Sequence, residues 1–409
     1  MELEKYSMSE DRVAVVNINQ DYCSRCLICY SICPYEAIQR DAETGKVEIN
    51  MQKCQVCGIC YSACPVFAIE IAYYNYDNLV KYVEDMLGKG KAETLVFMCR
   101  GNSPSTREIE EILANQGLSI KDYIPLRLPC SGRVPTEFIF KVLGLGVKKI
   151  VSIQCEDEFC RFKEGTKINT RRLALGRKVL EDLGFPGDAV TVIKYSRKAV
   201  YYTEKCVGCD KCVFICPYSA IEAEPFATPK ILYEYCMGCG ACAVVCPHHA
   251  IQVKGFEFED TLKRYCDTAI KLKVEGRSPL VLIFCCQWSE FSALDNPENV
   301  FSKRNCVVLE VPCFKALDPV HIVNALRNGF DGVMAAVCSA EDCKLQEGRD
   351  TAERNMAVLK DFLGKMGLIE RFELFEVSPR SAGEFEKKLD AFTNKIASIS
   401  STKLSKKEV

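Results

Sequence analysis

Hydrophobic residues in two long stretches of the chain occur in short runs that alternate with helical patterns. In the first stretch the runs have the length of strands and lie at residues 94–99, 123–130, 149–155 and 189–195. Segments with helical spacing of apolar positions separate them, at residues 106–116, 136–145 and 171–183. The second stretch has strand-length runs at residues 280–286, 306–313, 332–338 and 372–377. Alternating strands and helices are typical of a parallel sheet with crossover helices, so we expect two α/β domains of flavodoxin-like or Rossmann-like fold.

Two shorter stretches lack this pattern and are rich in cysteine. The chain has 27 cysteines, many of them in four runs of the form C-x2-C-x2-C-x3-C-P, and each run continues with two residues and Ala-Ile. A disulfide framework needs an oxidising compartment and is usual in short secreted chains. Here the cysteines lie in tight clusters within a long chain, so we interpret them as metal ligands.

The spacing of these runs is that of bacterial ferredoxins with two [4Fe–4S] clusters, in which the fourth cysteine of each run binds the other cluster. Zinc sites use paired C-x2-C motifs, which fit three cysteines in series poorly. The resemblance implies four [4Fe–4S] clusters with the ligand sets Cys23, Cys26, Cys29 and Cys64; Cys54, Cys57, Cys60 and Cys33; Cys206, Cys209, Cys212 and Cys246; and Cys236, Cys239, Cys242 and Cys216. Because stretches this short rarely fold on their core alone, the clusters are expected to supply much of the folding energy.

The cysteine pattern indicates an internal tandem duplication. Cys23 recurs 183 positions later as Cys206, and Cys54 recurs 182 positions later as Cys236. We therefore expect α+β ferredoxin-like modules to alternate with α/β domains. The expected boundaries are a module at residues 1–80, a domain at 81–198, a module at 199–260, a domain at 261–390 and a flexible tail at 391–409.

Each α/β domain contains four further matched cysteines. Three of them fall at the carboxyl ends of predicted strands, and the fourth follows five residues after the third. They are Cys99, Cys130, Cys155 and Cys160 in the first domain and Cys286, Cys313, Cys338 and Cys343 in the second. Because the carboxyl ends of parallel strands lie at one edge of a sheet, four thiols are expected to converge in each domain. Four thiolates suit either a [2Fe–2S] cluster or Zn²⁺.

The sequence around these cysteines resembles the delta subunit of methyl-viologen-reducing hydrogenase. The resemblance is carried by the motifs Pro129-Cys130-Ser131-Gly132-Arg133, Cys155-x4-Cys160, Glu164-Gly165 and Arg171. It implies that each set of four cysteines binds a [2Fe–2S] cluster. It also implies electron transfer between a heterodisulfide reductase-type FAD subunit and a hydrogenase or formate dehydrogenase, in an anaerobe.

The chain departs from that family at two places. Ser289 follows Trp288 where the family usually has a cysteine, and Phe314-Lys315-Ala316 replaces Ser-Gly-Arg in the second domain. Each domain still has four matched cysteines, which are enough for one site. Three cysteines without a counterpart in the other half, which we expect to be structural thiols, remain: Cys266, Cys285 and Cys306.

A few other polar residues have alternative interpretations. His248 and His249 lie beside a cluster run and could at most tune its potential, because that cluster already has four thiolates. His321 is expected to be an ordinary helix residue. Arg133 could tune a cluster, bind a partner or form a surface salt bridge.

Charge and missing motifs exclude several functions. The formal net charge is −2 and the pI is about 6.1, so neither nucleic acid nor an anionic membrane is an expected partner. No stretch approaches the length of apolar sequence that spans a membrane, and no secretory signal is present, so we expect a cytoplasmic protein. We find no G-x-G-x-x-G after a strand, no P-loop and no nucleophile elbow. The sequence therefore favours an electron-transfer subunit, the alternatives being a catalytic oxidoreductase subunit with an unrecognised flavin site and a zinc-bearing scaffold.

Overall fold

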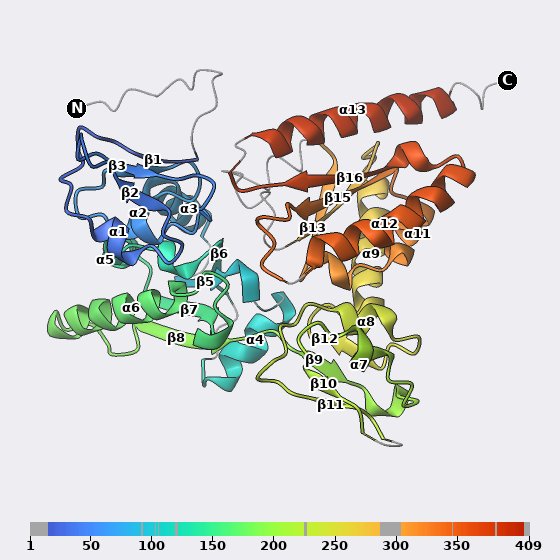
Figure 1. The fold of residues 1–409 in the computed structure, drawn as a ribbon, viewed down its shortest axis with the longest axis horizontal. Helices are drawn as coiled ribbons and strands as arrows, with labels where there is room; N and C mark the ends of the chain where they lie inside the picture. Colours follow the sequence, from blue (N-terminus) through green and yellow to red (C-terminus); the bar gives the residue numbers. More distant parts are fainter. Residues whose placement is uncertain are drawn as a thin grey trace.

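The computed structural model describes residues 15–90, 93–102, 104, 106–118, 122–224, 227–286, 304–345, 347–380 and 383–404. Four bodies follow one another along the chain and lie at the four corners of the molecule in Figure 1. Two are small cysteine-rich modules, which occupy opposite corners, and two are α/β domains, which occupy the other corners. Each module is therefore next to both domains.

The first module consists of two short antiparallel strand pairs and two single-turn helices. Strand β1 (Val16–Ile18) pairs with β4 (Ile69–Ile71), and β2 (Ile38–Arg40) pairs with β3 (Val47–Ile49). Helices α1 (Ile28–Ile32) and α2 (Ile59–Ala63) end at the cysteines that precede proline. Proline cannot continue a helix, which explains this stop.

The second module repeats this arrangement. Strand β9 (Ala199–Tyr201) pairs with β12 (Ile251–Val253), and β10 (Ile221–Glu222) pairs with β11 (Lys230–Ile231). The helices are α7 (Lys211–Ile215) and α8 (Ala241–Val245). Each strand has only two or three residues, so backbone pairing alone gives these modules little stability.

The first α/β domain contains a parallel sheet whose strands lie in the order β6-β5-β7-β8. The strands are β5 (Thr94–Cys99), β6 (Ile124–Leu128), β7 (Lys149–Cys155) and β8 (Val190–Tyr195). One face packs against α3 (Tyr76–Gly88), α5 (Thr136–Gly144) and α6 (Gly165–Asp182). The other face packs against α4 (Thr106–Asn115). The four predicted strands thus form one parallel sheet, as the alternating pattern indicates.

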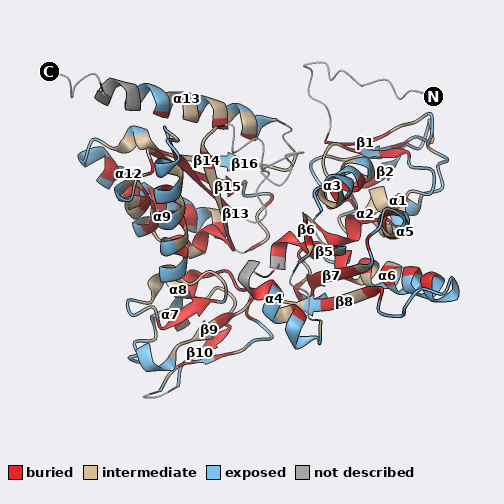
Figure 2. Ribbon diagram, turned by 180° about the vertical axis from the view of Figure 1, so that it is seen from behind, coloured by how far each residue is buried: buried red, intermediate tan, exposed pale blue. Residues whose placement is uncertain are grey.

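The second α/β domain has the equivalent strand order, β14-β13-β15-β16. The strands are β13 (Val281–Cys286), β14 (Cys306–Val311), β15 (Gly332–Cys338) and β16 (Phe372–Val377). Helices α9 (Phe258–Val274), α11 (Pro319–Arg327) and α12 (Gly348–Lys365) cover one face, and α13 (Glu384–Leu404) covers the other. Figure 2 shows buried strands at the centre of each sheet, with helices exposed on their outer sides.

Three helices cross expected domain boundaries. Helix α3 spans residue 80, α9 spans residue 260 and α13 spans residue 390. The expected flexible tail at 391–409 differs from the structure over residues 391–404, which continue α13. Phe392 and Ile396 of this segment are buried against the sheet, and this apolar stripe stabilises the helix although the surrounding residues are polar.

Charged contacts also join the two halves. Glu310 of β14 lies 3.2 Å from Arg127 of β6 and 3.7 Å from Arg100 of the first domain. Both arginines help to keep the pKa of the Glu310 carboxyl below its usual value, against the effect of burial. No helix in the described ranges is long and apolar enough to cross a membrane.

Candidate iron–sulfur sites

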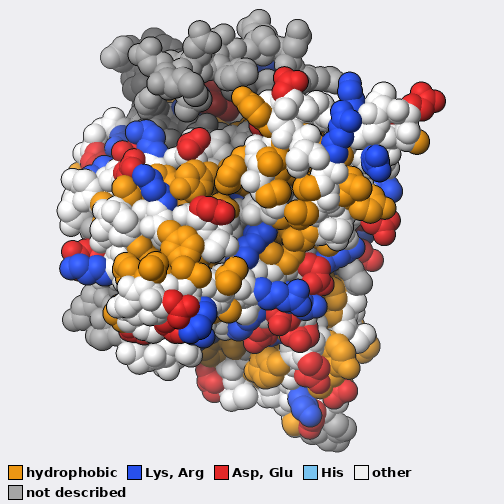
Figure 3. Space-filling view, turned by 90° about the vertical axis from the view of Figure 1, so that its left-hand side faces the viewer, with side chains coloured by type: hydrophobic (Ala, Val, Ile, Leu, Met, Phe, Trp, Pro, Cys, Tyr) orange, Lys and Arg blue, Asp and Glu red, His pale blue; other side chains and the backbone are white. Residues whose placement is uncertain are grey.

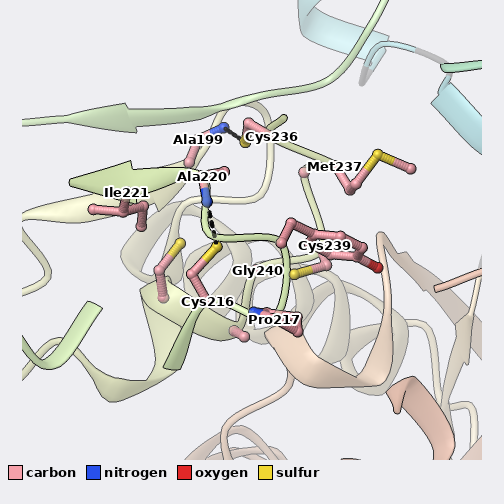
Figure 4. A pocket seen from close by; sticks show the side chains of 13 residues that line it. Ala199, Cys216, Pro217, Ala220, Ile221, Cys236, Met237, Cys239 and Gly240 are labelled. Carbon is pink, nitrogen blue, oxygen red and sulfur yellow. Dashed lines mark hydrogen bonds between the residues drawn. The ribbon is translucent and has the colours of Figure 1, made fainter. Parts of the chain in front are cut away.

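Each module contains two cavities, and each cavity is lined by four cysteines, three from one run and the fourth from the other. In the first module, a cavity of about 320 Å³ contains the set that we name outer site 1, Cys23, Cys26, Cys29 and Cys64. A cavity of about 390 Å³ contains inner site 1, Cys33, Cys54, Cys57 and Cys60. In the second module, a cavity of about 330 Å³ contains outer site 2, Cys206, Cys209, Cys212 and Cys246. A cavity of about 340 Å³ contains inner site 2, Cys216, Cys236, Cys239 and Cys242 (Figure 4).

Backbone N–H groups point at the sulfurs of these sites. The alanine of the Ala-Ile motif donates to the sulfur of the cysteine four residues before it: Ala68 to Cys64 at 3.3 Å, Ala220 to Cys216 at 3.3 Å and Ala250 to Cys246 at 3.2 Å. Figure 4 shows the Ala220 bond together with a second one, from Ala199 N–H to Cys236 Sγ at 3.4 Å. Such donors stabilise thiolate sulfur, so the cavities fit a bound iron–sulfur cluster.

Burial differs between the outer and inner sites. Each outer site has an exposed cysteine, Cys26 or Cys209, whereas Cys57 and Cys239 of the inner sites are buried. Burial raises the pKa of the Cys57 thiol to about 12 and raises that of Cys239 as well. Without a positive centre these inner thiols would stay protonated at neutral pH, and iron binding must displace their protons.

The four cysteines of the first α/β domain meet at the carboxyl edge of its sheet, and we name them strand-end site 1. Cys99 ends β5 and Cys155 ends β7, while Cys130 follows β6. Ser131 N–H donates to Cys99 Sγ at 3.2 Å, and hydrogen bonds from the Cys130 and Cys155 thiols help to lower the pKa of Cys99. A hydrogen bond from Cys155 lowers the pKa of Cys160 to about 7. All four thiols therefore belong to one coupled group.

A glycine leaves room beside this group. Gly165 begins α6, and a Cβ placed on it would overlap Cys130 Sγ and lie 3.8 Å from Cys160 Sγ. The Glu164-Gly165 motif is therefore explained by the close approach of a helix start to the thiols.

The second domain has an equivalent strand-end site 2, formed by Cys286, Cys313, Cys338 and Cys343. The sulfurs of Cys338 and Cys286 are 4.0 Å apart, and Cys343 Sγ donates to the Leu345 carbonyl at 2.9 Å. A Cβ on Gly348 would lie 2.9 Å from Cys313 Sγ and 3.0 Å from Cys343 Sγ. Among the described residues, no three His, Cys, Asp or Glu side chains meet at the spacing of a single bound metal ion.

The remaining predicted residues have varied environments. Arg133 is buried rather than part of a surface salt bridge, and it donates to the carbonyls of Cys57 at 3.4 Å, Tyr73 at 3.0 Å and Val56. Cys285 and Cys306 are buried and Cys266 is partly buried. Trp288 and Ser289 lie outside the described residues.

His249 stacks on Phe258 at 4.5 Å between ring centroids, and Phe258 contacts the ring of His321, also at 4.5 Å. His321 is a buried residue of α11, as expected of a helix residue.

Two basic residues that sequence reasoning missed lie between the halves. Arg161 follows Cys160, and its Nη2 donates to the Met237 carbonyl of the second module at 2.8 Å. Lys344 follows Cys343, and its Nζ donates to Gln55 Oε1 of the first module. The signal for them was present, because both follow the fourth cysteine of their domain at equivalent positions of the repeat.

Comparison with known families agrees with this geometry. Models of 4Fe-4S dicluster domains match residues 15–65 and 189–253. The chain is therefore an iron–sulfur protein that contains 4Fe-4S dicluster domains. The model of the methyl-viologen-reducing hydrogenase delta subunit matches residues 94–206 and 281–400, which together exceed half of the chain. The chain belongs to this delta-subunit family.

Curated relatives belong to two kinds of complex. The ferredoxin/F420H2-dependent CoB-CoM heterodisulfide reductase of Methanosarcina acetivorans has a polypeptide that is 29% identical over 199 residues, which are 48% of this chain and 25% of the relative. The chain thus spans about a quarter of that relative's length. The iron-sulfur polypeptide of the F420-non-reducing hydrogenase of Archaeoglobus profundus is 32% identical over 117 residues, 28% of this chain and 85% of the relative. The chain is accordingly an iron–sulfur electron-transfer subunit related to components of both complexes.

Proposed function

We propose that this chain passes single electrons between a heterodisulfide reductase-type flavoprotein and a hydrogenase or formate dehydrogenase, as one subunit of a hetero-oligomeric complex in an anaerobe. Its centres would be four [4Fe–4S] clusters in the modules and two [2Fe–2S] clusters at the strand-end sites. The observation that carries the proposal is the gathering of cysteines into six separate groups of four. Four groups line their own cavities, and two lie at the ends of parallel strands.

When bound, the clusters supply reversible one-electron oxidation and reduction. The protein's own residues hold the clusters and control their surroundings. Cysteine thiolates would be the ligands, N–H groups such as that of Ala220 would stabilise the sulfur charge, and burial at the inner sites excludes water. The sequence contains no recognisable motif for a substrate or an organic cofactor, so chemistry on substrate would belong to the partners.

The outer sites are the proposed points at which electrons enter and leave. Exposed aromatic residues surround outer site 1, with Tyr22 69% exposed and Phe67 61% exposed. Figure 3 shows hydrophobic side chains interspersed with charged ones on this side of the molecule. At outer site 2, Phe214 is 88% exposed. Exposed aromatic side chains are common at protein interfaces, which supports partner docking at both ends.

The test is metal and sulfide analysis of the anaerobically purified chain, together with EPR of the reduced protein. The proposal requires about 20 irons per chain, from four cubane and two binuclear clusters. Both types of EPR signal should appear on reduction. Zinc in place of a [2Fe–2S] signal would show that the strand-end sites are structural metal sites, and an iron-free chain would end the electron-transfer proposal.

The partners are tested separately, by anaerobic affinity purification from the native organism. A flavoprotein and a hydrogenase or formate dehydrogenase should accompany the chain. A lone chain, or bound flavin and turnover of a small molecule by the purified chain, would contradict the assignment. The cytoplasmic location stays a prediction.

A further inference from the structure

The two halves of the molecule contact each other next to their thiol groups, and these contacts are crossed. In the first contact, Arg161 of the first domain bonds to Met237 of the second module. Arg161 is the residue after Cys160 of strand-end site 1, and Met237 is the residue after Cys236 of inner site 2. One hydrogen bond therefore links residues adjacent to ligands of two different sites.

The second contact uses the equivalent positions in the opposite direction. Lys344 of the second domain bonds to Gln55 of the first module. Lys344 follows Cys343 of strand-end site 2, and Gln55 follows Cys54 of inner site 1. The Lys344 ammonium also lies 5.2 Å from the ring centroid of Phe162 and 5.7 Å from that of Tyr35, so it contacts both bodies of the first half.

Contacts within each half complete the arrangement. Cys57 of inner site 1 packs in one buried cluster with Cys130 of strand-end site 1. Cys239 of inner site 2 packs in another buried cluster with Cys313 of strand-end site 2. Each strand-end site therefore contacts the inner site of its own half through packed side chains, and the inner site of the other half through a basic residue.

Arg161 is suited to a negatively charged neighbour. It is 9% exposed, and within the described part of the chain its Nε and Nη1 atoms have no hydrogen-bond partner. A guanidinium buried without a carboxylate partner is costly unless another negative charge compensates it. Thiolate-bound iron–sulfur centres carry net negative charge, and the thiols of Cys155, Cys239 and Cys313 are close enough to act on Arg161 electrostatically.

We propose that Arg161 and Lys344 are positioning residues that couple each strand-end site to the inner site of the other half, so that the four central centres form one closed ring with the two outer sites as terminals. The proposal rests on the proposed function, because it needs clusters at these sites. An electron that enters at either outer site can then reach the other by two routes. Each step oxidises one cluster by one electron and reduces its neighbour by one, and no covalent bond changes.

The test is an EPR-monitored redox titration of the full cluster-loaded chain, with dithionite as reductant and viologen dyes as one-electron mediators. Arg161→Met removes a buried positive charge, which disfavours the reduced state of every nearby cluster. We expect it to lower the potentials of one [2Fe–2S] signal and one [4Fe–4S] signal together. Arg161→Lys keeps the charge and should restore most of both shifts. Arg177→Met, at an arginine of α6 whose side chain is 53% exposed, is the control and should shift neither.

Lys344→Met tests the same claim from the other half and involves a partly exposed side chain, so it remains informative if Arg161→Met fails to load its clusters. It should lower the potentials of the other [2Fe–2S] signal and of a different [4Fe–4S] signal. Shifts confined to [2Fe–2S] signals, or no shift in a fully loaded variant, would overturn the ring but leave the proposed function intact. A wild-type chain without clusters would overturn both.

Discussion

Gly58 lies directly beneath the buried side chain of Arg133, so that a Cβ on Gly58 would be 2.7 Å from Arg133 Cγ. This contact joins the loop after Cys57 to the turn after Cys130, and it exists because Gly58 has no side chain. The same approach recurs in the second half, where a Cβ on Gly240 would lie 3.0 Å from Ala316 Cα. Replacing arginine by alanine at the equivalent position has therefore preserved the close packing of module and domain.

Gly58→Ala is expected to destabilise the protein more than a glycine substitution at a comparable backbone angle. Gly58 has φ +80° and Gly90 has φ +67°, but nothing lies within 4 Å of a Cβ on Gly90. Each change costs about 1–2 kcal/mol for the left-handed backbone alone. Gly58→Ala must in addition displace Arg133 from its bonds to the first module. Anaerobic thermal unfolding and iron content should show a larger loss for Gly58→Ala, and equal losses would mean that Arg133 moves aside freely.

Chelation of iron is expected to unfold the modules and spare the sheets. The modules have strands of two or three residues and cores made partly of the cysteines themselves. The α/β domains have large apolar cores around β5 and β13 that contain no cluster. After anaerobic chelation, hydrogen exchange should accelerate over residues 15–72 and 199–253 and stay slow in the central strands. Retained protection in the modules would show that their apolar cores suffice.

Gly348 and Gly364 provide a matched pair on α12. A Cβ on Gly348 would lie 2.9 Å from Cys313 Sγ, whereas nothing lies within 4 Å of a Cβ on Gly364. Gly348→Ala is expected to displace the thiols and abolish one [2Fe–2S] EPR signal. Gly364→Ala should keep every signal and stabilise the helix by up to about 1 kcal/mol, because alanine has the higher helix propensity. An unchanged spectrum in Gly348→Ala would mean that strand-end site 2 binds no cluster.

The sequence was most informative where the determinants of structure are local. The cluster runs could be recognised because spacing within a single loop places three cysteines around one cavity. The convergence of Cys99, Cys130 and Cys155 followed from the strands that they terminate, because parallel strands share one edge. The offset between equivalent cysteines also related Cys160 to Cys343 before any geometry was known.

Features that depend on packing between distant segments could not be predicted. Nothing local to Arg161 indicates that its partner is Met237, 76 residues away, because the contact depends on how the halves pack. The burial of Arg133 depends in the same way on its contact with the first module. The helical end of the chain was missed because Phe392 and Ile396 are separated by polar residues, and a second helix-covered sheet face was needed to explain them.

Acid is expected to destabilise the second domain through His321. This side chain is 3% exposed, and burial, reinforced by the nearby His249, lowers its pKa from 6.5 to about 4. Between these values the unfolded chain binds a proton that the folded chain does not, so stability is complete above about pH 6.5 and falls as the pH approaches 4. The total effect is at most about 3 kcal/mol, since one pKa unit corresponds to 1.36 kcal/mol.

His321→Phe should remove this part of the pH dependence, because phenylalanine can pack against Phe258 and Tyr265 without titrating. His248→Phe, at an exposed histidine in the neighbouring loop, is the control and should keep the wild-type slope. The measurement is the unfolding midpoint in denaturant at several pH values between 4 and 7, with clusters intact. A wild-type slope in His321→Phe would show that acid acts through other groups, with the cluster thiolates as the first candidates.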